Sequence, residues 1–228
     1  SRYNKMAEMI LGHQGQKVLD YGCGLGAFSD ALGGRGFDVT GIDPLPEYID
    51  AAKRVYIKNQ NVRFITGNID QITSEDFDWV ISQQVAEHTH NPGTYLAEIN
   101  RVLKVGGKLL ISVPNTANPR FFLAPVILSK AKYERSLIEL SRKMAQNYKK
   151  ETHHIQAWDQ QHFVRLVSTL GFSLLQYMPL EGVPLPWVFN KYLKLPAYIR
   201  LPGRFANWCY TMAFVFEKCS NIKLHPND

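Results

Sequence analysis

The sequence predicts a single α/β domain in which helices cover both faces of a doubly wound, mostly parallel sheet. Three observations indicate this fold class. The chain has 228 residues, 45% of them apolar, which is enough for one large core. Its first half alternates apolar runs of strand length with helical patterns, as stacked βα units do. The first of these runs leads directly into the glycine-rich stretch YGCGLG, which suits a turn from a strand into a helix.

The first half contains five predicted strands with helices between them. Pro46 suits the first position of a helix whose apolar face carries Ile49 and Ala52. Gly106 and Gly107 close the last of these helices, because glycine readily adopts the left-handed backbone of a helix end. The predicted strands are 17–22, 37–43, 62–67, 77–84 and 108–115, and the predicted helices are 26–33, 46–56 and 92–103.

The second half of the chain departs from this alternation. Residues 116–150 combine helical apolar spacing with many Lys and Arg and contain no strand pattern. We expect them to form a helical insertion that lies over the sheet as a lid. The Pro-rich, aromatic stretch 180–206 is expected to extend this cover.

Two further strands are predicted near the end of the chain. Asp159 caps a helix that ends at Gly171. Strand six is expected at 172–178 and strand seven at 207–218, which brings the sheet to seven strands. All of these elements, together with the insertions, are assigned to one domain over residues 1–228.

Positive charge is concentrated in the second half. The chain has a net charge of +6, and residues 115–207 hold 13 Lys or Arg against 5 Asp or Glu. Such a surface suits an anionic substrate, an anionic membrane or nucleic acid, and it also arises on an ordinary solvated helix face. The charge pattern alone leaves these alternatives open.

The cysteines and the apolar runs bear on the compartment. The three cysteines are widely spaced and form no CxxC pair, which argues against a disulfide framework and indicates a reducing compartment. The apolar run CYTMAFVF is much shorter than the roughly 18 residues that a spanning helix needs. We therefore expect a cytoplasmic protein without a membrane span, with peripheral membrane contact as an option.

The glycine-rich stretch and an acid after the second strand predict a nucleoside site. In an open parallel sheet, ligands bind beyond the carboxyl ends of the strands. Gly22, Gly24 and Gly26 let a ligand touch the main chain, and the following helix offers free N–H groups. Asp43 can accept hydrogen bonds from two ribose hydroxyls. Asp20 would repel a pyrophosphate, whereas it suits a ligand that carries a positive sulfonium and ammonium.

A dinucleotide site is the alternative to this interpretation. Gly22, Gly24 and Ala27 satisfy the spacing G-x-G-x-x-G/A, so a nicotinamide-linked oxidoreductase has one motif in its favour. A single match of this kind is a weak signal.

Residues 17–115 carry further motifs in a fixed order. They are VLDYGCGLG, VTGIDP, RFITGNID, DWVISQQVAEHTHNP and LAEINRVLKVGGKLLISVPN. In this order and spacing they resemble the class I S-adenosylmethionine-dependent methyltransferases. The resemblance implies a Rossmann-like sheet of seven strands with the last one antiparallel. It also implies S-adenosyl-L-methionine as cofactor and S-adenosyl-L-homocysteine as product.

The resemblance assigns cofactor contacts residue by residue. Around the methionine part it places Asp20, Gly22, Gly24, Gly26 and Gln83, at the ribose Asp43, and along the adenine Pro44, Leu45, Asn68 and Ile69. Asn68 departs from the family, which usually has an acid there. Its amide can still form a hydrogen bond with the exocyclic amine of adenine.

The catalytic candidates come from two segments. VAEHTHNP resembles the EH stretch of ubiquinone-type O-methyltransferases and their small-molecule relatives, and it supplies Glu87 and His88 as candidate bases. His88 could instead cap the following helix. His154 matches a histidine that the family often has after the lid. Some relatives hold a divalent metal with a glutamate at the position of Gln84, so we expect no required metal here.

The acceptor is the least specified part of the predicted function. We expect methylation at oxygen of a small molecule, with lipid-like and glycan-linked acceptors as options. Aromatic residues among the cations suit an anionic or amphiphilic acceptor, although they could simply pack the lid; they are Phe121, Phe122, Trp187, Phe189, Tyr192 and Tyr198. Nucleic acid is not expected, because the chain has no RNA module and no NPPY-type loop. A protein that binds the cofactor without turnover is the alternative function, and the sequence leaves the oligomeric state open.

Overall fold

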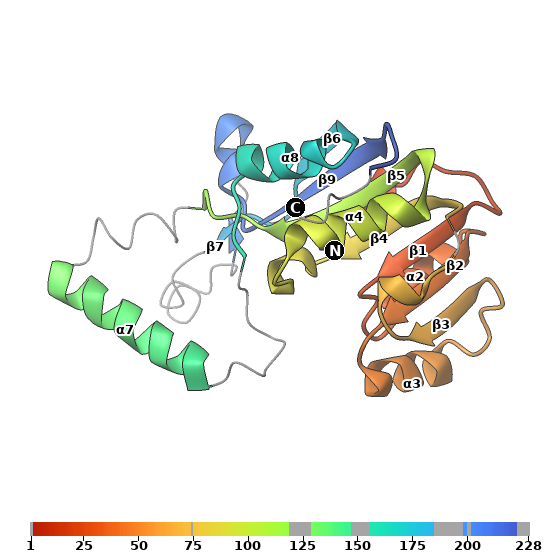
Figure 1. The fold of residues 1–228 in the computed structure, drawn as a ribbon, viewed down its shortest axis with the longest axis horizontal. Helices are drawn as coiled ribbons and strands as arrows, with labels where there is room; N and C mark the ends of the chain where they lie inside the picture. Colours follow the sequence, from red (N-terminus) through yellow and green to blue (C-terminus); the bar gives the residue numbers. More distant parts are fainter. Residues whose placement is uncertain are drawn as a thin grey trace.

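The centre of the molecule is one seven-stranded sheet with helices on both faces (Figure 1). The computed structural model describes residues 2–73, 75–118, 129–146, 156–184, 198–199 and 202–222. Within these ranges, none of the helices combines the length and the apolar character needed to cross a membrane.

The first half folds as the sequence predicts. Its elements are β1 (Lys17–Tyr21), α2 (Ala27–Gly33), β2 (Asp38–Asp43), α3 (Pro46–Val55), β3 (Val62–Thr66), β4 (Phe77–Gln83), α4 (Pro92–Val102) and β5 (Leu103–Pro114). All predicted bounds up to α4 are confirmed to within one residue. Pro46 opens α3 as expected, and Asn91 caps α4 by accepting the Thr94 N–H at 3.0 Å.

Two features of this half were not predicted. The strand expected to begin at residue 108 begins at Leu103, which pairs with Phe77 before the register shifts at a bulge containing Gly106. An additional helix, α1 (Arg2–Met9), precedes the sheet. It is held because Arg35 donates hydrogen bonds to main-chain oxygens of α1 and of the residue that follows it.

The second half completes the sheet with an antiparallel strand. The strand order is β3-β2-β1-β4-β5-β9-β6, in which β9 (Thr211–Lys218) runs antiparallel between β5 and β6 (Phe172–Pro179). This confirms the seven-stranded sheet whose last strand is antiparallel. Strand β9 begins four residues later than predicted, because Gly203–Trp208 form the short 3-10 helix η3.

The remaining elements flank this sheet. Helix α8 (Gln160–Thr169) starts at the predicted cap, where Asp159 accepts the His162 N–H at 2.9 Å. The stretch expected as a second cover contains the short strand pair β7 (Val183–Pro184) and β8 (Tyr198–Ile199). The insertion contains α7 (Lys130–Gln146), and two 3-10 helices, η1 (Ile69–Gln71) and η2 (Ala86–His88), lie in the first half.

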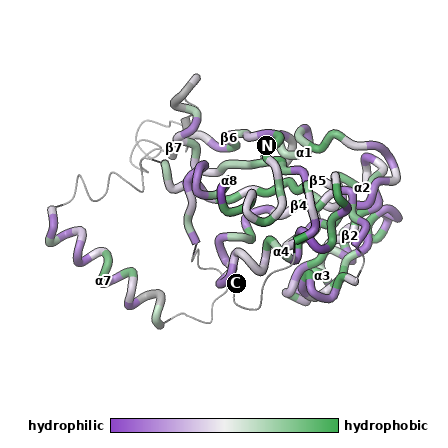
Figure 2. Tube along the Cα trace, turned by 45° about the horizontal axis from the view of Figure 1, so that its top comes forward, coloured by the Kyte–Doolittle hydropathy of each residue, from purple (hydrophilic) through white to green (hydrophobic). Residues whose placement is uncertain are grey.

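The core consists of two apolar layers, one on each face of the sheet. Alternate strand residues supply both layers, because successive side chains of a strand point to opposite faces. One layer packs α4 and α8 onto the sheet through Leu96, Ile99, Phe163 and Val167. The other packs α1 and α2 onto it through Met6, Met9, Phe28 and Leu32. Apolar residues are accordingly frequent along the central strands in Figure 2.

Helix α7 lies in the insertion that the sequence predicts as a lid. In the ribbon of Figure 1 and in the tube of Figure 2, it stands away from the sheet. Much of the predicted covers at 116–150 and 180–206 lies outside the described residues, including the side chains of all six aromatic candidates. The lid therefore stays a prediction, as does the assignment of residues 1–228 to one domain.

Candidate active site

The turn from β1 into α2 is built on three left-handed glycines. Gly22, Gly24 and Gly26 have φ values of +77°, +53° and +80°, a region that other residues rarely adopt. A Cβ on Gly22 would overlap a methyl group of Val85, and one on Gly26 would lie 2.6 Å from the Phe64 ring. Around Gly24, by contrast, no described atom lies within 4 Å of such a Cβ. Packing therefore requires the outer two glycines, and the middle one leaves an open face for a ligand.

Asp43 links this turn to the end of β2. Its carboxylate accepts the N–H of Gly24 at 2.9 Å and the N–H of Leu45 at 3.0 Å, one on each oxygen. A carboxylate has about four lone-pair sites, so both oxygens can accept further hydrogen bonds. The group is thus oriented by the main chain and still fits a pair of ribose hydroxyls.

Asp20 is a buried acid at the end of β1. The Ser29 hydroxyl of α2 donates to it at 2.6 Å. Burial raises the pKa of this carboxyl to about 6, although the Ser29 hydrogen bond opposes the shift. A cationic ligand group nearby would favour the ionised form, which fits the predicted position of the methionine part.

Gln83 ends β4, the strand beside β1. Within the described part of the chain, its buried Oε1 has no hydrogen-bond partner. A buried amide oxygen without a partner costs free energy unless a ligand supplies a donor. An ammonium group is such a donor, so Gln83 also fits its predicted contact with the methionine part.

The predicted adenine residues lie at the same edge of the sheet. The Gly67 N–H donates to the Asp43 carbonyl at 3.0 Å and so joins the ends of β2 and β3. Pro44 and Asn68 are exposed there, whereas Ile69, the first residue of η1, is buried in the core. Their contacts with adenine stay predictions.

The catalytic candidates Glu87 and His88 share the turn η2. Glu87 is fully buried. Burial raises the pKa of the nearby Tyr95 hydroxyl, and the charge of Glu87 adds a smaller contribution in the same direction. His88 is partly exposed, so an acceptor can reach it more readily than Glu87. His154 lies outside the described residues. Gln156, two residues later, donates its N–H to the Glu87 carbonyl at 3.1 Å, so the chain after the insertion returns to this turn.

Gln84 directs the start of this second loop. It has φ +55°, the only positive φ of a non-glycine residue in the described ranges, and its N–H donates to the Ser112 carbonyl at 3.0 Å. This turn places Val85 against Gly22, so the loop after β4 touches the glycine turn between β1 and α2. The described residues contain no group of three metal-ligating side chains, and the prediction that no metal is required stays untested.

The contacts that hold the base of the insertion were not predicted from the sequence. The fully buried Asn115 donates to the carbonyls of Asn207 at 2.8 Å and Cys209 at 2.9 Å. The Thr116 N–H donates to the Trp158 carbonyl at 2.9 Å. We call residues 115–118, 156–160 and 207–209 the insertion neck. The one sequence feature that could have indicated the neck is a pair of asparagines directly after a buried strand.

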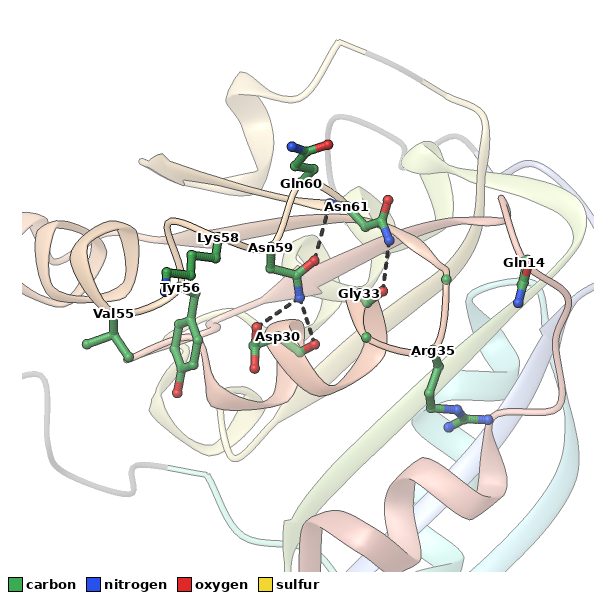
Figure 3. Close-up of a pocket in the computed structure, with 12 residues that line it drawn as sticks. Gln14, Asp30, Gly33, Arg35, Val55, Tyr56, Lys58, Asn59, Gln60 and Asn61 are labelled. Carbon is green, nitrogen blue, oxygen red and sulfur yellow. Dashed lines mark hydrogen bonds between the residues drawn. The ribbon is translucent and has the colours of Figure 1, made fainter.

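A broad polar cavity lies on the far side of the sheet from the glycine turn, at the amino ends of the strands (Figure 3). Its volume is about 1160 Å³, and it is lined mainly by the turns that precede β2 and β3. Asn59 donates to Asp30 and Asn61 donates to Gly33, so these amides hold the turns together. The cavity lies at the amino ends of the strands and is separate from the glycine turn.

Comparison with known proteins indicates a family. Residues 19–111 match the family described as a methyltransferase domain. Over this stretch the chain is similar to class I S-adenosylmethionine-dependent methyltransferases. The geometry of Gly24, Asp43, Asp20 and Gln83 fits S-adenosylmethionine, the cofactor of that class. The oxidoreductase alternative has no support from these matches.

Several curated relatives of this chain share one name. The ubiquinone biosynthesis O-methyltransferase of Dechloromonas aromatica is 32% identical over 117 residues, which is 50% of each chain. The human mitochondrial protein of that name is 34% identical over 119 residues, 49% of this chain and 32% of its own length. The Coxiella burnetii protein is 29% identical over 183 residues, 78% of this chain and 74% of its own length. The matches thus span about half of the first relative and a third of the second.

Solved structures resemble the chain over nearly its whole length. A putative methyltransferase from Bacillus halodurans superposes with a TM-score of 0.63 at 18% identity, covering 96% of this chain and 99% of its own. A structure of the Haloferax volcanii Trm112 activator in complex with a putative methyltransferase gives 0.67 at 17% identity, covering 94% and 88%. These likenesses establish the fold.

Proposed function

We propose that this protein transfers a methyl group from S-adenosylmethionine to an oxygen of a small amphiphilic molecule. The observation that carries the proposal is Asp43, whose carboxylate is held by two main-chain amides beside the open face of Gly24. The shared name of the curated relatives supports oxygen of a small molecule as the acceptor.

The cofactor half of the site would act through charge and main-chain geometry. When bound, S-adenosylmethionine supplies a methyl group on a positively charged sulfur, which departs as a neutral sulfide. Asp43 would hold the ribose, and the carboxylate of Asp20 would balance the positive charge of the methionine part. Gln83 would accept a hydrogen bond from the ammonium through its buried oxygen.

The acceptor half would supply alignment and a base. A hydroxyl acceptor must lose its proton as its oxygen forms the bond to the methyl carbon. His88 is our candidate to take that proton, because its side chain is accessible in the turn that touches the glycine loop. His154 is a second candidate, since the chain next to it returns to Glu87. Glu87, which is buried in the same turn, is the third candidate base.

The chemical character of the acceptor follows from charge. Residues 115–207, which we expect around the acceptor side of the site, hold 13 Lys or Arg against 5 Asp or Glu. An anionic head group would be attracted to this region, and the aromatic side chains of the same segments would suit an apolar body. A cytoplasmic location with peripheral membrane contact is part of this proposal.

Calorimetry with S-adenosylhomocysteine and with NAD tests the cofactor. We expect binding of the first and none of the second. Asp43→Ala should weaken binding by about 1–3 kcal/mol through loss of charge-assisted hydrogen bonds. Asp38→Ala, at the other end of β2, is the matched control and should leave the affinity unchanged. Equal affinity in the Asp43 variant would remove the ribose assignment.

Turnover with alkylated phenols as acceptors tests the chemistry. His88→Gln should lower kcat by about 10²–10⁴ if it takes the proton, with little change in the affinity for S-adenosylhomocysteine. Cofactor binding without any turnover over a broad panel of hydroxyl acceptors would favour the non-catalytic alternative.

A further inference from the structure

Helix α7 exposes an apolar surface that no described element covers. Leu137, Ile138 and Leu140 are 47%, 45% and 55% exposed. At 100° per residue they fall within an arc of about 160° on one side of the helix. The helix itself stands away from the sheet (Figure 1). Isolated exposed leucines are ordinary, whereas three neighbouring apolar residues on a helix that stands apart indicate a contact surface.

The same helix is basic. Residues 130–146 contain five Lys or Arg and two Glu, a net charge of +3. Lys132, Arg135 and Arg142 are exposed, and the helical period places them opposite the apolar side chains. Lys130 and Glu134, also exposed, fall on the same side as the apolar residues. A basic polar face opposite an apolar face is typical of helices that lie in the plane of a membrane surface.

The insertion neck forms the base of the insertion that contains α7, next to the turn that holds Glu87. Its asparagine amides join the end of β5 to the segment that precedes β9. Trp208, in that segment, is 38% exposed although tryptophan is usually well buried. Tryptophan favours the interface between lipid and water, because its ring is apolar and its N–H is polar.

We infer that α7 and Trp208 form a docking surface for an anionic lipid bilayer. The apolar arc of α7 would enter the boundary between head groups and acyl chains, and its cations would lie among lipid phosphates and carboxylates. A second copy of this chain is a poorer occupant, because two surfaces of net charge +3 repel each other. Docking would present the acceptor side of the site to an amphiphilic acceptor held in the bilayer.

This inference deepens the proposed function and rests on it for the acceptor, because it assigns the membrane contact proposed there to α7 and Trp208. Membrane binding is measurable without cofactor or acceptor, so it is tested separately from methyl transfer. The experiment is co-sedimentation of the full chain with vesicles of phosphatidylcholine and phosphatidylserine, and with vesicles of phosphatidylcholine alone. We expect binding to the anionic vesicles, little binding to the neutral ones, and release at high salt. Equal binding to both kinds of vesicle, or binding to neither, overturns the proposal.

Two variants separate the apolar and charged contributions. The triple variant Leu137→Gln, Ile138→Gln and Leu140→Gln keeps good helix formers and should weaken binding at least about tenfold. Lys132→Gln with Arg135→Gln should weaken it by about 25-fold, at roughly fivefold per cation. Unchanged binding in the triple variant overturns the assignment to α7.

A control pair tests whether any loss is specific to α7. Val55 and Ile57 are 68% and 79% exposed, more than the α7 residues, and they lie beside the polar cavity at the amino ends of the strands. Val55→Gln with Ile57→Gln should therefore bind vesicles like the unchanged protein. An equal loss in this pair would overturn the proposal, because the effect would then reflect general surface hydrophobicity.

Two further measurements distinguish membrane docking from misfolding of the variants and from closure of α7 over the active site. The thermal unfolding temperature and the affinity for S-adenosylhomocysteine should be unchanged in the α7 variants. Vesicle binding itself needs no cofactor, so a failure of the cofactor assignment would leave it intact. Hydrogen exchange in residues 130–146 should slow only with anionic vesicles. Slowing with S-adenosylhomocysteine alone would show that α7 closes over its own chain, which contradicts the proposal.

Discussion

The two halves of the active-site edge are held by different kinds of contact. In the cofactor half, residues 17–83, glycines in left-handed conformations and main-chain amides fix the turn around Asp43. In the acceptor half, side-chain amides such as that of Asn115 join segments more than 90 residues apart in the chain. The first half depends on the local backbone and the second on distant side-chain contacts.

This difference fits the proposed function, in which the two halves bind different molecules. The cofactor is common to the whole class, so its half can rely on one fixed backbone geometry. The acceptor differs between enzymes, and insertions can vary it when they are attached through a compact neck. Variants in the first half should therefore change the affinity for the cofactor. Variants in the second half should change how firmly the acceptor segments are held.

The largest effect is expected for Gly22→Ala. Its positive φ and the overlap with Val85 should together lower the free energy of unfolding by about 3 kcal/mol or more. Gly106→Ala is the matched control, because it has a similar φ of +81° and no neighbour within 4 Å among the described residues. Urea unfolding should show a clearly smaller loss for Gly106→Ala, and equal losses would contradict the role of Val85.

Asp20→Asn should stabilise the protein while weakening the cofactor contact. The folded pKa of about 6 lies above the unfolded value of about 3.9, so the folded state binds more protons between these values. Stability is therefore lost as pH rises through this window, and the ionised carboxyl costs about 2–3 kcal/mol at pH 7. Denaturation should show this gain at about pH 7 and little difference below about pH 4.

The same carboxyl should make cofactor binding depend on pH. S-adenosylmethionine should bind the unchanged protein more weakly as pH falls below about 6, because protonation removes the negative charge. Calorimetry of Asp20→Asn should show weaker binding without this dependence. A variant that keeps full affinity at neutral pH would refute the electrostatic role.

Asn115→Ala should loosen the acceptor half alone. Two carbonyls would lose their buried donor, which should cost about 2 kcal/mol of stability. Hydrogen exchange should accelerate in residues 203–210, with unchanged affinity for S-adenosylhomocysteine. Asn100→Ala removes two similar hydrogen bonds elsewhere, to the carbonyls of Leu170 and Ser220, and should not affect residues 203–210 selectively.

The smallest expected effect is that of Gly24→Ala. Because the site of its Cβ is open, only the left-handed backbone should be penalised, by about 1 kcal/mol of stability. Affinity for S-adenosylhomocysteine should nevertheless fall, since the new methyl group would occupy the face assigned to the ligand. Gly106→Ala should show a similar stability loss with normal affinity.

The same contrast explains how much the sequence could predict. Strand and helix bounds up to α4 were predicted to within one residue, because apolar period, Pro46 and the glycines are local signals. The loop after β4 was located, but the burial of Glu87 depends on its packing near Tyr95 and carries no local signal. The neck hydrogen bonds of Asn115 join residues that only the folded sheet brings together.

Strand β9 has a consequence for the synthesis of this protein. It fills the gap between β5 and β6, yet residues 211–218 leave the ribosome after every other strand of the sheet. Until then β5, whose Leu109, Ile111 and Val113 are fully buried in the finished fold, has one unpaired edge. Such an edge is a template for aggregation, and domains emerge from the ribosome N-terminal part first. Fragments that stop before Thr211 keep that edge permanently, so expression trials on shortened chains should retain β9.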